Sequence, residues 1–230
     1  MDLVVQDLAC VRGGRRVFAE TSFTLHRGEF TVLVGPNGSG KSTLLRAIAG
    51  LVPIERGDVR FGDASLRDDR ETLQEQIAYV GHLDGVKPAL TVRENLRSWA
   101  RISGAAAGAE LERALDETLN RFHLSALEDA PAAQCSAGQK RRLGLSRLVL
   151  HPRPLWLLDE PTVALDTAAN EALGALIDAH RKTGGVVIAA THAPLSVAPD
   201  RELSMNAFAP VGAEEADPFL EDAGDEEVWA

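Results

Sequence analysis

The sequence predicts an α/β fold in which a mainly parallel sheet is interrupted by a helical insert. Two nearly continuous apolar segments, 30–34 and 186–190, are typical of strands buried on both faces, as parallel sheets require. Strands and helices alternate in residues 1–82 and again in 151–205, whereas 83–150 shows helical patterns only. This order indicates a parallel α/β core with a helical subdomain inserted between its two parts.

The individual elements follow from apolar spacing and from end signals. The expected strands are short apolar runs at 3–5, 30–34, 77–80, 155–158 and 186–190. The expected helices carry apolar side chains three or four residues apart, at 42–49, 91–101, 111–122, 136–150 and 168–182. Thr91 and Glu94 form a capping-box pattern, and Gly50 is a stop signal. A Gly/Ala-rich linker is expected at 103–108.

Composition bounds the class of protein. The chain has 230 residues, 45% of them hydrophobic, which is enough for one sizeable core or two small lobes. Of the net charge of −10, eight negative charges lie in residues 206–230, which contain no Lys or Arg. This acidic tail is expected to be loosely ordered. The rest is close to neutral, so the broad basic surface of a nucleic-acid-binding protein is not expected.

The cysteines and the N-terminus indicate a reduced compartment and no targeting signal. Cys10 and Cys135 lie far apart and have no metal-ligand spacing around them. The N-terminus is acidic and lacks the long apolar core of a signal peptide. No apolar run approaches the roughly 20 residues that span a bilayer. If this protein serves a membrane, another chain is expected to cross it.

A glycine-rich loop supplies the strongest chemical signal. It fits the pattern G-x-x-x-x-G-K-[ST] between a strand and a helix and consists of Gly35, Pro36, Asn37, Gly38, Ser39, Gly40, Lys41 and Ser42, with Thr43 following. The glycines let backbone N–H groups surround phosphate oxygens, and the helix directs its positive end at the same charge. Lys41 is expected to reach the β- and γ-phosphates, and Ser42 to offer its hydroxyl to Mg²⁺. The loop therefore predicts ATP as the ligand, together with Mg²⁺.

Two acids follow the apolar strand 155–158. A parallel strand delivers such residues to the carboxyl edge of the sheet, where the ligands of these sheets bind. Asp159 is expected to hold Mg²⁺, largely through water, and Glu160 to act as general base on the attacking water. The alternative is a solvated strand end, which the phosphate-binding loop makes much less favourable.

The segment Cys135-Ser136-Ala137-Gly138-Gln139 resembles the ABC ATPase signature, usually written L-S-G-G-Q. The resemblance extends over about residues 3–205. It implies a P-loop NTPase (RecA-like) core at 1–82 and 151–205 with N-terminal antiparallel β elements. It further implies a helical subdomain at 83–150 that carries the signature, followed by the acidic tail 206–230.

The same resemblance implies an ATP-dependent homodimer. Ser136, Gly138 and Gln139 would then face nucleotide bound on the second ATP-binding subunit, and a serine at a helix N-terminus suits an anion. Ala164-Leu165-Asp166 resembles the D-loop, which touches the partner subunit. His192, directly after Thr191, resembles the switch histidine that contacts the γ-phosphate.

Two positions depart from the family pattern. Arg12 stands where an aromatic side chain normally stacks on adenine; its guanidinium could stack on the base, or it could be a surface charge. His82 stands where the family has a glutamine that senses Mg²⁺ and the attacking water. A neutral imidazole could do that work, or His82 could lie away from the site and leave a slower enzyme.

The histidine belongs to a longer run, Gly81 to Leu96, with the pattern G-H-x-x-G-x-K-x-x-L-T-x-x-E-N-L. The run is similar to that of the haem-export ATP-binding subunits of bacterial cytochrome c maturation; Trp156 and Asp217-Pro218-Phe219-Leu220 fit them too. The resemblance implies a membrane-spanning permease partner, an indirect periplasmic haem chaperone and a peripheral place on the cytoplasmic face of the inner membrane. Two alternatives stay open: a regulatory module that binds ATP with little turnover, and a soluble ABC ATPase acting on nucleic acid or ribosomes.

Overall fold

The computed structural model describes residues 1–102 and 107–209. Most of the predicted linker 103–108 and of the acidic tail 206–230 lies outside the described residues, as does the segment 217–220. The principal helices are α1 (Lys41–Ile48), α2 (Arg70–Glu75), α3 (Val92–Ile102), α4 (Ala109–Arg121), α5 (Ala137–Leu150) and α6 (Thr167–Lys182). Short 3-10 helices cover Ser125–Leu127, Ala132–Gln134 and Met205–Phe208.

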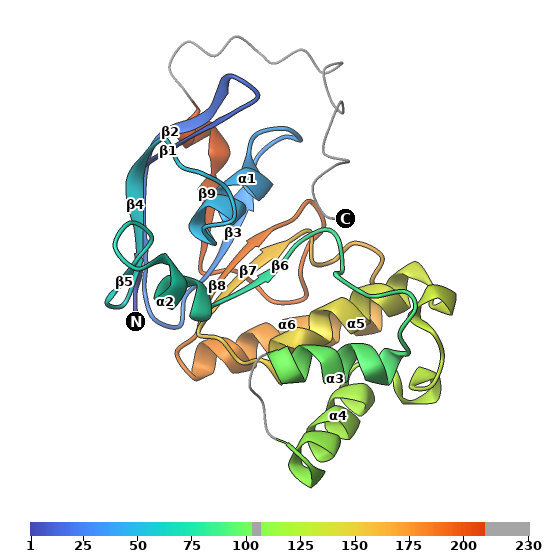
Figure 1. Ribbon diagram of the computed structural model, residues 1–230. Helices are drawn as coiled ribbons and strands as arrows, with labels where there is room; N and C mark the ends of the chain where they lie inside the picture. The colour runs from blue at the N-terminus through green and yellow to red at the C-terminus, as the bar shows by residue number, and fades with distance from the viewer. Residues whose placement is uncertain (103–106, 210–230) are drawn as a thin grey trace.

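The central sheet is parallel and has the order β6-β7-β8-β3-β9. Its strands are β3 (Phe30–Val34), β6 (Ile77–Val80), β7 (Leu155–Asp159), β8 (Val186–Ala190) and β9 (Arg201–Ser204). The first four of these confirm the predicted strands. Strands β3, β8 and β7 are neighbours in this sheet (Figure 1). Because parallel strands end at the same edge, the glycine-rich loop after β3, the acids at the end of β7 and the histidine after β8 are brought to one edge.

A second, antiparallel sheet lies beside the first and has the order β2-β1-β4-β5 (Figure 1). Its strands are β1 (Leu3–Arg12), β2 (Arg15–Leu25), β4 (Arg56–Phe61) and β5 (Ala64–Ser65). It confirms the antiparallel N-terminal elements, but the predicted strand 3–5 is far too short. The register of β1 shifts against both neighbours, which breaks the alternation of apolar and polar residues on which the sequence prediction depends.

Helices fill the space on both faces of the parallel sheet. Helix α1 lies between the two sheets, where Leu44 and Ile48 join a core with Phe18 and Leu157. Helices α5 and α6 cover the opposite face, packing against a second core that includes Trp156. The Trp156 indole stacks on the His180 imidazole with ring centroids 3.8 Å apart. This indole therefore takes part in ordinary core packing.

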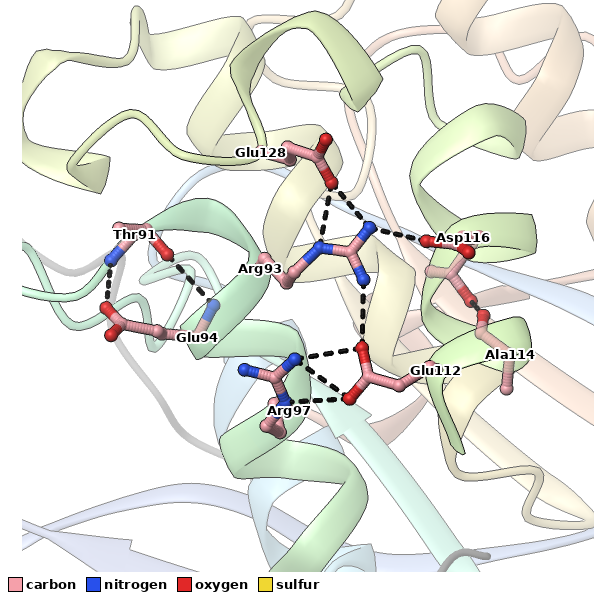
Figure 2. A network of polar contacts seen from close by, with 9 residues as sticks. Thr91, Arg93, Glu94, Arg97, Glu112, Ala114, Asp116 and Glu128 are labelled. Atoms are coloured by element: carbon pink, nitrogen blue, oxygen red, sulfur yellow. Dashed lines mark hydrogen bonds and ion pairs between the residues drawn. The ribbon is translucent and has the colours of Figure 1, made fainter. Parts of the chain in front are cut away.

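The helices between β6 and β7 have a core of their own, centred on apolar residues of α3, α4 and α5. Figure 2 shows the polar network that joins α3 to its neighbours. Arg93 forms ion pairs with Glu112 and Asp116 of α4 and with Glu128. Within the described part of the chain, Arg97 pairs with Glu112 alone. The hydrogen bonds that Arg93 donates to Asp116 and Glu128 raise the pKa of Arg93, so the guanidinium stays charged at any working pH.

Replacing Arg93 with Gln should lower the free energy of unfolding by about 1–2 kcal/mol, because three carboxylates lose a shared, partly buried cation. Arg97→Gln is the matched control on the same helix. It removes a single partner and should cost under about 1 kcal/mol. Urea unfolding of the two variants tests this; equal midpoints would show that the network does not hold α3 and α4 together.

Candidate nucleotide-binding site

The glycine-rich loop connects β3 to α1, and its shape depends on Gly40. This residue caps the N-terminus of α1 with φ of 94°, a left-handed conformation that favours glycine. A Cβ on Gly40 would lie 2.5 Å from Cγ1 of Val17, a residue of β2. The antiparallel sheet therefore packs directly on the loop and helps to fix the start of the helix.

Lys41 is the first residue of α1 and is 7% exposed. Its Nζ donates hydrogen bonds to the carbonyl oxygens of Gly35, at 2.8 Å, and Pro36, at 2.9 Å. Burial lowers the pKa of Lys41, while the charges of Glu160 and Asp159 act in the opposite direction. The ammonium is thus held across the mouth of the loop, where an incoming phosphate would meet it.

Ser42 and Asp159 face each other across the sheet edge. The Ser42 Oγ donates to Oδ1 of Asp159 at 2.8 Å, and the carboxylate is 1% exposed. A hydroxyl and a carboxylate side by side offer the oxygen ligands that Mg²⁺ prefers, so this pair fits the predicted ion.

Tyr79 of β6 completes the surroundings of the carboxylate. Its hydroxyl donates to Oδ2 of Asp159 at 3.3 Å and accepts from Nε of Arg46, also at 3.3 Å. Burial raises the pKa of Tyr79, which keeps this donor protonated. The sequence prediction missed both residues, because neither belongs to a motif. The signal available was the position of Tyr79 on the strand beside the acids.

Replacing Tyr79 with Phe keeps the ring but removes the hydrogen bond to Asp159. We expect the Mg²⁺ concentration that half-saturates ATP hydrolysis to rise about tenfold, as for other residues that orient a metal ligand. A Mg²⁺ titration at saturating ATP measures the change. An unchanged half-saturation point would mean that Ser42 alone orients the carboxylate.

Glu160 and His192 lie at the ends of neighbouring strands. Glu160 has φ of 48°, an uncommon left-handed conformation for a residue with a side chain, and its N–H donates to the carbonyl of Ala190 at 2.8 Å. Its carboxylate accepts the backbone N–H of His192 at 3.3 Å, and the imidazole Nε2 lies 3.5 Å from Oε1. The two side chains are therefore placed as a pair.

The glycine-rich loop, Glu160 and His192 line one cavity of about 350 Å³. The predicted residues that line it are Asn37, Gly38, Ser39, Gly40, Lys41, Ser42, Thr43, Glu160 and His192, joined by Val17. The other predicted site residues do not line it. Gly35, Pro36 and Asp159 lie next to residues that do. Arg12 ends β1 opposite Arg15, and His82 is exposed in the loop after β6.

The signature segment lines a different cavity, of about 260 Å³, together with the residues before and at the start of α6. Ser136 caps α5: its Oγ accepts the N–H of Gln139 at 3.3 Å, and the Gln139 side chain accepts the N–H of Ser136 at 2.7 Å. Asp166 caps α6 in the same way, accepting the N–H of Ala169 at 2.8 Å. Within one chain the signature and the glycine-rich loop thus belong to separate cavities.

The family model described as ABC transporter matches residues 18–163, more than half of the chain. The cytochrome c biogenesis ATP-binding export protein CcmA of Paramagnetospirillum magneticum is 47% identical over 204 residues, covering 89% of this chain and 94% of the relative. The protein of the same name from Rhodospirillum rubrum is 45% identical, covering 95% and 92%. The chain belongs to the ABC transporter family, as a CcmA-like ATP-binding protein.

Solved structures agree with this ABC ATPase assignment. One, described as the ATP-binding subunit of an ABC transporter, aligns with a TM-score of 0.75 at 32% identity, covering 84% of this chain and 80% of its own. A putative ABC transporter ATP-binding protein from Pyrococcus furiosus aligns at 0.77 and 21% identity, covering 91% and 100%, which supports the fold. These matches confirm the predicted fold class, and the chain is an ATPase of the ABC type that binds ATP. Across residues 1–102 and 107–209, no helix has the length and apolarity to cross a bilayer.

Proposed function

We propose that this chain is the ATP-hydrolysing subunit of a membrane ABC transporter of cytochrome c maturation, powering haem export or release of a loaded haem chaperone. The observation that carries the proposal is the cavity in which Lys41, Ser42, Glu160 and His192 meet. The haem-related part rests on likeness to relatives named for cytochrome c biogenesis.

In this proposal the glycine-rich loop and Lys41 bind the phosphates of ATP, and water attacks the γ-phosphorus. Glu160 takes the proton of that water as the new P–O bond forms and the bond to the β-phosphate oxygen breaks. His192 holds the Glu160 carboxylate and reaches the γ-phosphate. Ser42 and Asp159 would hold Mg²⁺, which neutralises charge on the phosphates.

We further propose that two copies form the working unit when ATP is bound. The signature of one chain, with Ser136, Gly138 and Gln139, would complete the phosphate site of the other. The separate cavity that the signature lines supports this arrangement, since it leaves the signature free to meet a second nucleotide. The helical subdomain 83–150 would then be one body that moves against the core formed by 1–82 and 151–205.

Arg12 and His82, the two residues that depart from the family pattern, also act in ATP binding and hydrolysis. Arg12 stacks its guanidinium on adenine, since Val17 of the same β-hairpin already lines the phosphate cavity. His82 takes the place of the family glutamine at the attacking water. A permease in the inner membrane docks on the cytoplasmic side, and a periplasmic haem chaperone is coupled indirectly; no nucleic acid takes part.

The test is ATP hydrolysis by the purified chain, alone and after reconstitution with cytochrome c maturation membrane subunits. Turnover that these subunits stimulate would support the proposal. Stimulation by a different permease would keep the ATPase and remove the haem assignment. ATP binding without turnover in every preparation would favour a regulatory module instead.

A further inference from the structure

Arg141 is a buried cation, and none of the sequence motifs described above assigns it a role. It lies on α5, two residues after Gln139 of the signature, and its side chain is 4% exposed. Its guanidinium binds the backbone where β7 ends: Nη2 donates to the carbonyls of Asp159, at 3.0 Å, and Glu160, at 2.7 Å, and Nε donates to that of Pro161, at 3.3 Å. Three consecutive carbonyls are thus fixed by one side chain.

The remaining nitrogen of Arg141 binds the loop after β6. Its Nη1 donates to the carbonyl of Gly81 and to Oδ1 of Asp84, both at 2.9 Å. Helix α5 also touches this loop at Gly144, where an added Cβ would lie 3.0 Å from both Cβ and O of Asp84. The loop carries His82 and the exposed Leu83, so Arg141 joins an outward-facing segment to the acids of the site.

Burying a guanidinium is costly unless its donors are satisfied with good geometry. Here a single carboxylate and four backbone carbonyls share the donors, and the planar fork of arginine can reach them together where a lysine or glutamine cannot. An apolar residue would fill the same space more simply. The arrangement therefore indicates that Arg141 holds the bound backbone in a fixed position, and does not merely fill space in the core.

The contact with Glu160 indicates that Arg141 positions the backbone of this acid. The backbone of Glu160 is held in its left-handed conformation from both sides, with its N–H on Ala190 and its carbonyl on Arg141. The direction of the Glu160 side chain toward the cavity follows from this backbone. A displacement of about 1 Å at a catalytic group can cost about 100-fold in rate.

We propose that Arg141 is a positioning residue that fixes Glu160 for hydrolysis and ties it to the position of the Gly81–Asp84 loop. This inference rests on the proposed ATP hydrolysis with Glu160 as base. It predicts that disturbing Arg141 or the loop contact changes the rate of hydrolysis and leaves ATP binding intact, because Arg141 does not line the phosphate cavity.

The test compares Arg141→Gln, Asp84→Ala and Arg93→Gln with the unchanged chain. Arg141→Gln should lower kcat about 30-fold. Asp84→Ala, which removes only the acceptor on the loop, should lower kcat about 3- to 10-fold. Both should keep the Kd for ATP, measured by a fluorescent ATP analogue, within about twofold. Arg93→Gln is the control for a loss of folding stability in the same region, and it should keep kcat within about twofold.

Two results would show that Arg141 is only a structural residue. One is a loss of ATP affinity in Arg141→Gln as large as its loss of kcat. The other is an Arg93→Gln variant that has the same thermal midpoint as Arg141→Gln and loses as much kcat. Unchanged kcat in Arg141→Gln or in Asp84→Ala would also overturn the proposal. The unchanged chain and Glu160→Gln are assayed beside them. Absence of turnover in the unchanged chain would instead remove the proposed hydrolysis itself, so the two failures are distinguishable.

Discussion

Glu160→Gln should lower kcat for ATP hydrolysis by at least about 100-fold and leave the Kd for ATP within about twofold. An amide cannot take the proton of the attacking water, and loss of a general base costs about 100- to 10,000-fold. The amide oxygen can still accept the N–H of His192, which the carboxylate now binds at 3.3 Å. The change therefore removes the proton acceptor and keeps the hydrogen bond that places the side chain.

The same variant should collect as an ATP-bound pair of chains, because binding continues while hydrolysis stops. Size-exclusion chromatography with and without ATP measures the pair, and single-turnover hydrolysis measures the rate. Glu171→Gln, an exposed change on α6, is the matched control and should behave like the unchanged chain. A Glu160→Gln variant that hydrolyses ATP at the full rate would exclude this residue as the base.

Much of the candidate site could be predicted from the sequence because its motifs are local. The glycine-rich loop follows β3, the two acids lie at the end of β7, and the histidine follows β8 after one threonine. All three strands are buried and parallel. The carboxyl ends of parallel strands lie at one edge of a sheet. The local motifs were therefore sufficient to predict that Lys41, Glu160 and His192 share one cavity.

The residues that support the site could not be predicted in this way. Arg141 meets Glu160 from 19 positions away and Gly81 from 60, and Tyr79 meets Asp159 from 80. No periodicity carries such contacts, which depend on how α5 and β6 pack. The antiparallel sheet was hard to predict for another reason: the register shifts of β1 break its alternating pattern.

Gly138 belongs to a sequence motif and also makes a tight contact that only the structure shows. Resemblance predicts that it faces nucleotide on a second subunit, and the structure adds a contact within the same chain. A Cβ on Gly138 would lie 2.7 Å from the carbonyl oxygen of Ala164, a distance that real Cβ atoms essentially never show. That neighbour is backbone, and Ala164 itself has φ of 62°, so it cannot move without disturbing the turn before α6.

Gly138→Ala should therefore push the signature helix and the Ala164–Asp166 turn apart, on the surface that we propose meets the second subunit. We expect kcat to fall about 100-fold, because a small displacement there misplaces groups that complete the partner's site. The free energy of unfolding should fall by about 1–3 kcal/mol, as for other overpacked contacts. The Kd for ATP should stay within about twofold, since the phosphate cavity contains no residue of the signature.

Steady-state hydrolysis, thermal unfolding and ATP binding separate these effects. Lys140→Ala, a change on the same turn of α5 that loses one long hydrogen bond of 3.4 Å to Ala133, is the control and should keep kcat within about twofold. Equal rates for Gly138→Ala and Lys140→Ala would mean that the Ala164 turn can relax and that the pairing surface tolerates the shift. A loss of ATP binding in Gly138→Ala would instead show that the signature and the glycine-rich loop are coupled within one chain, which their separate cavities argue against.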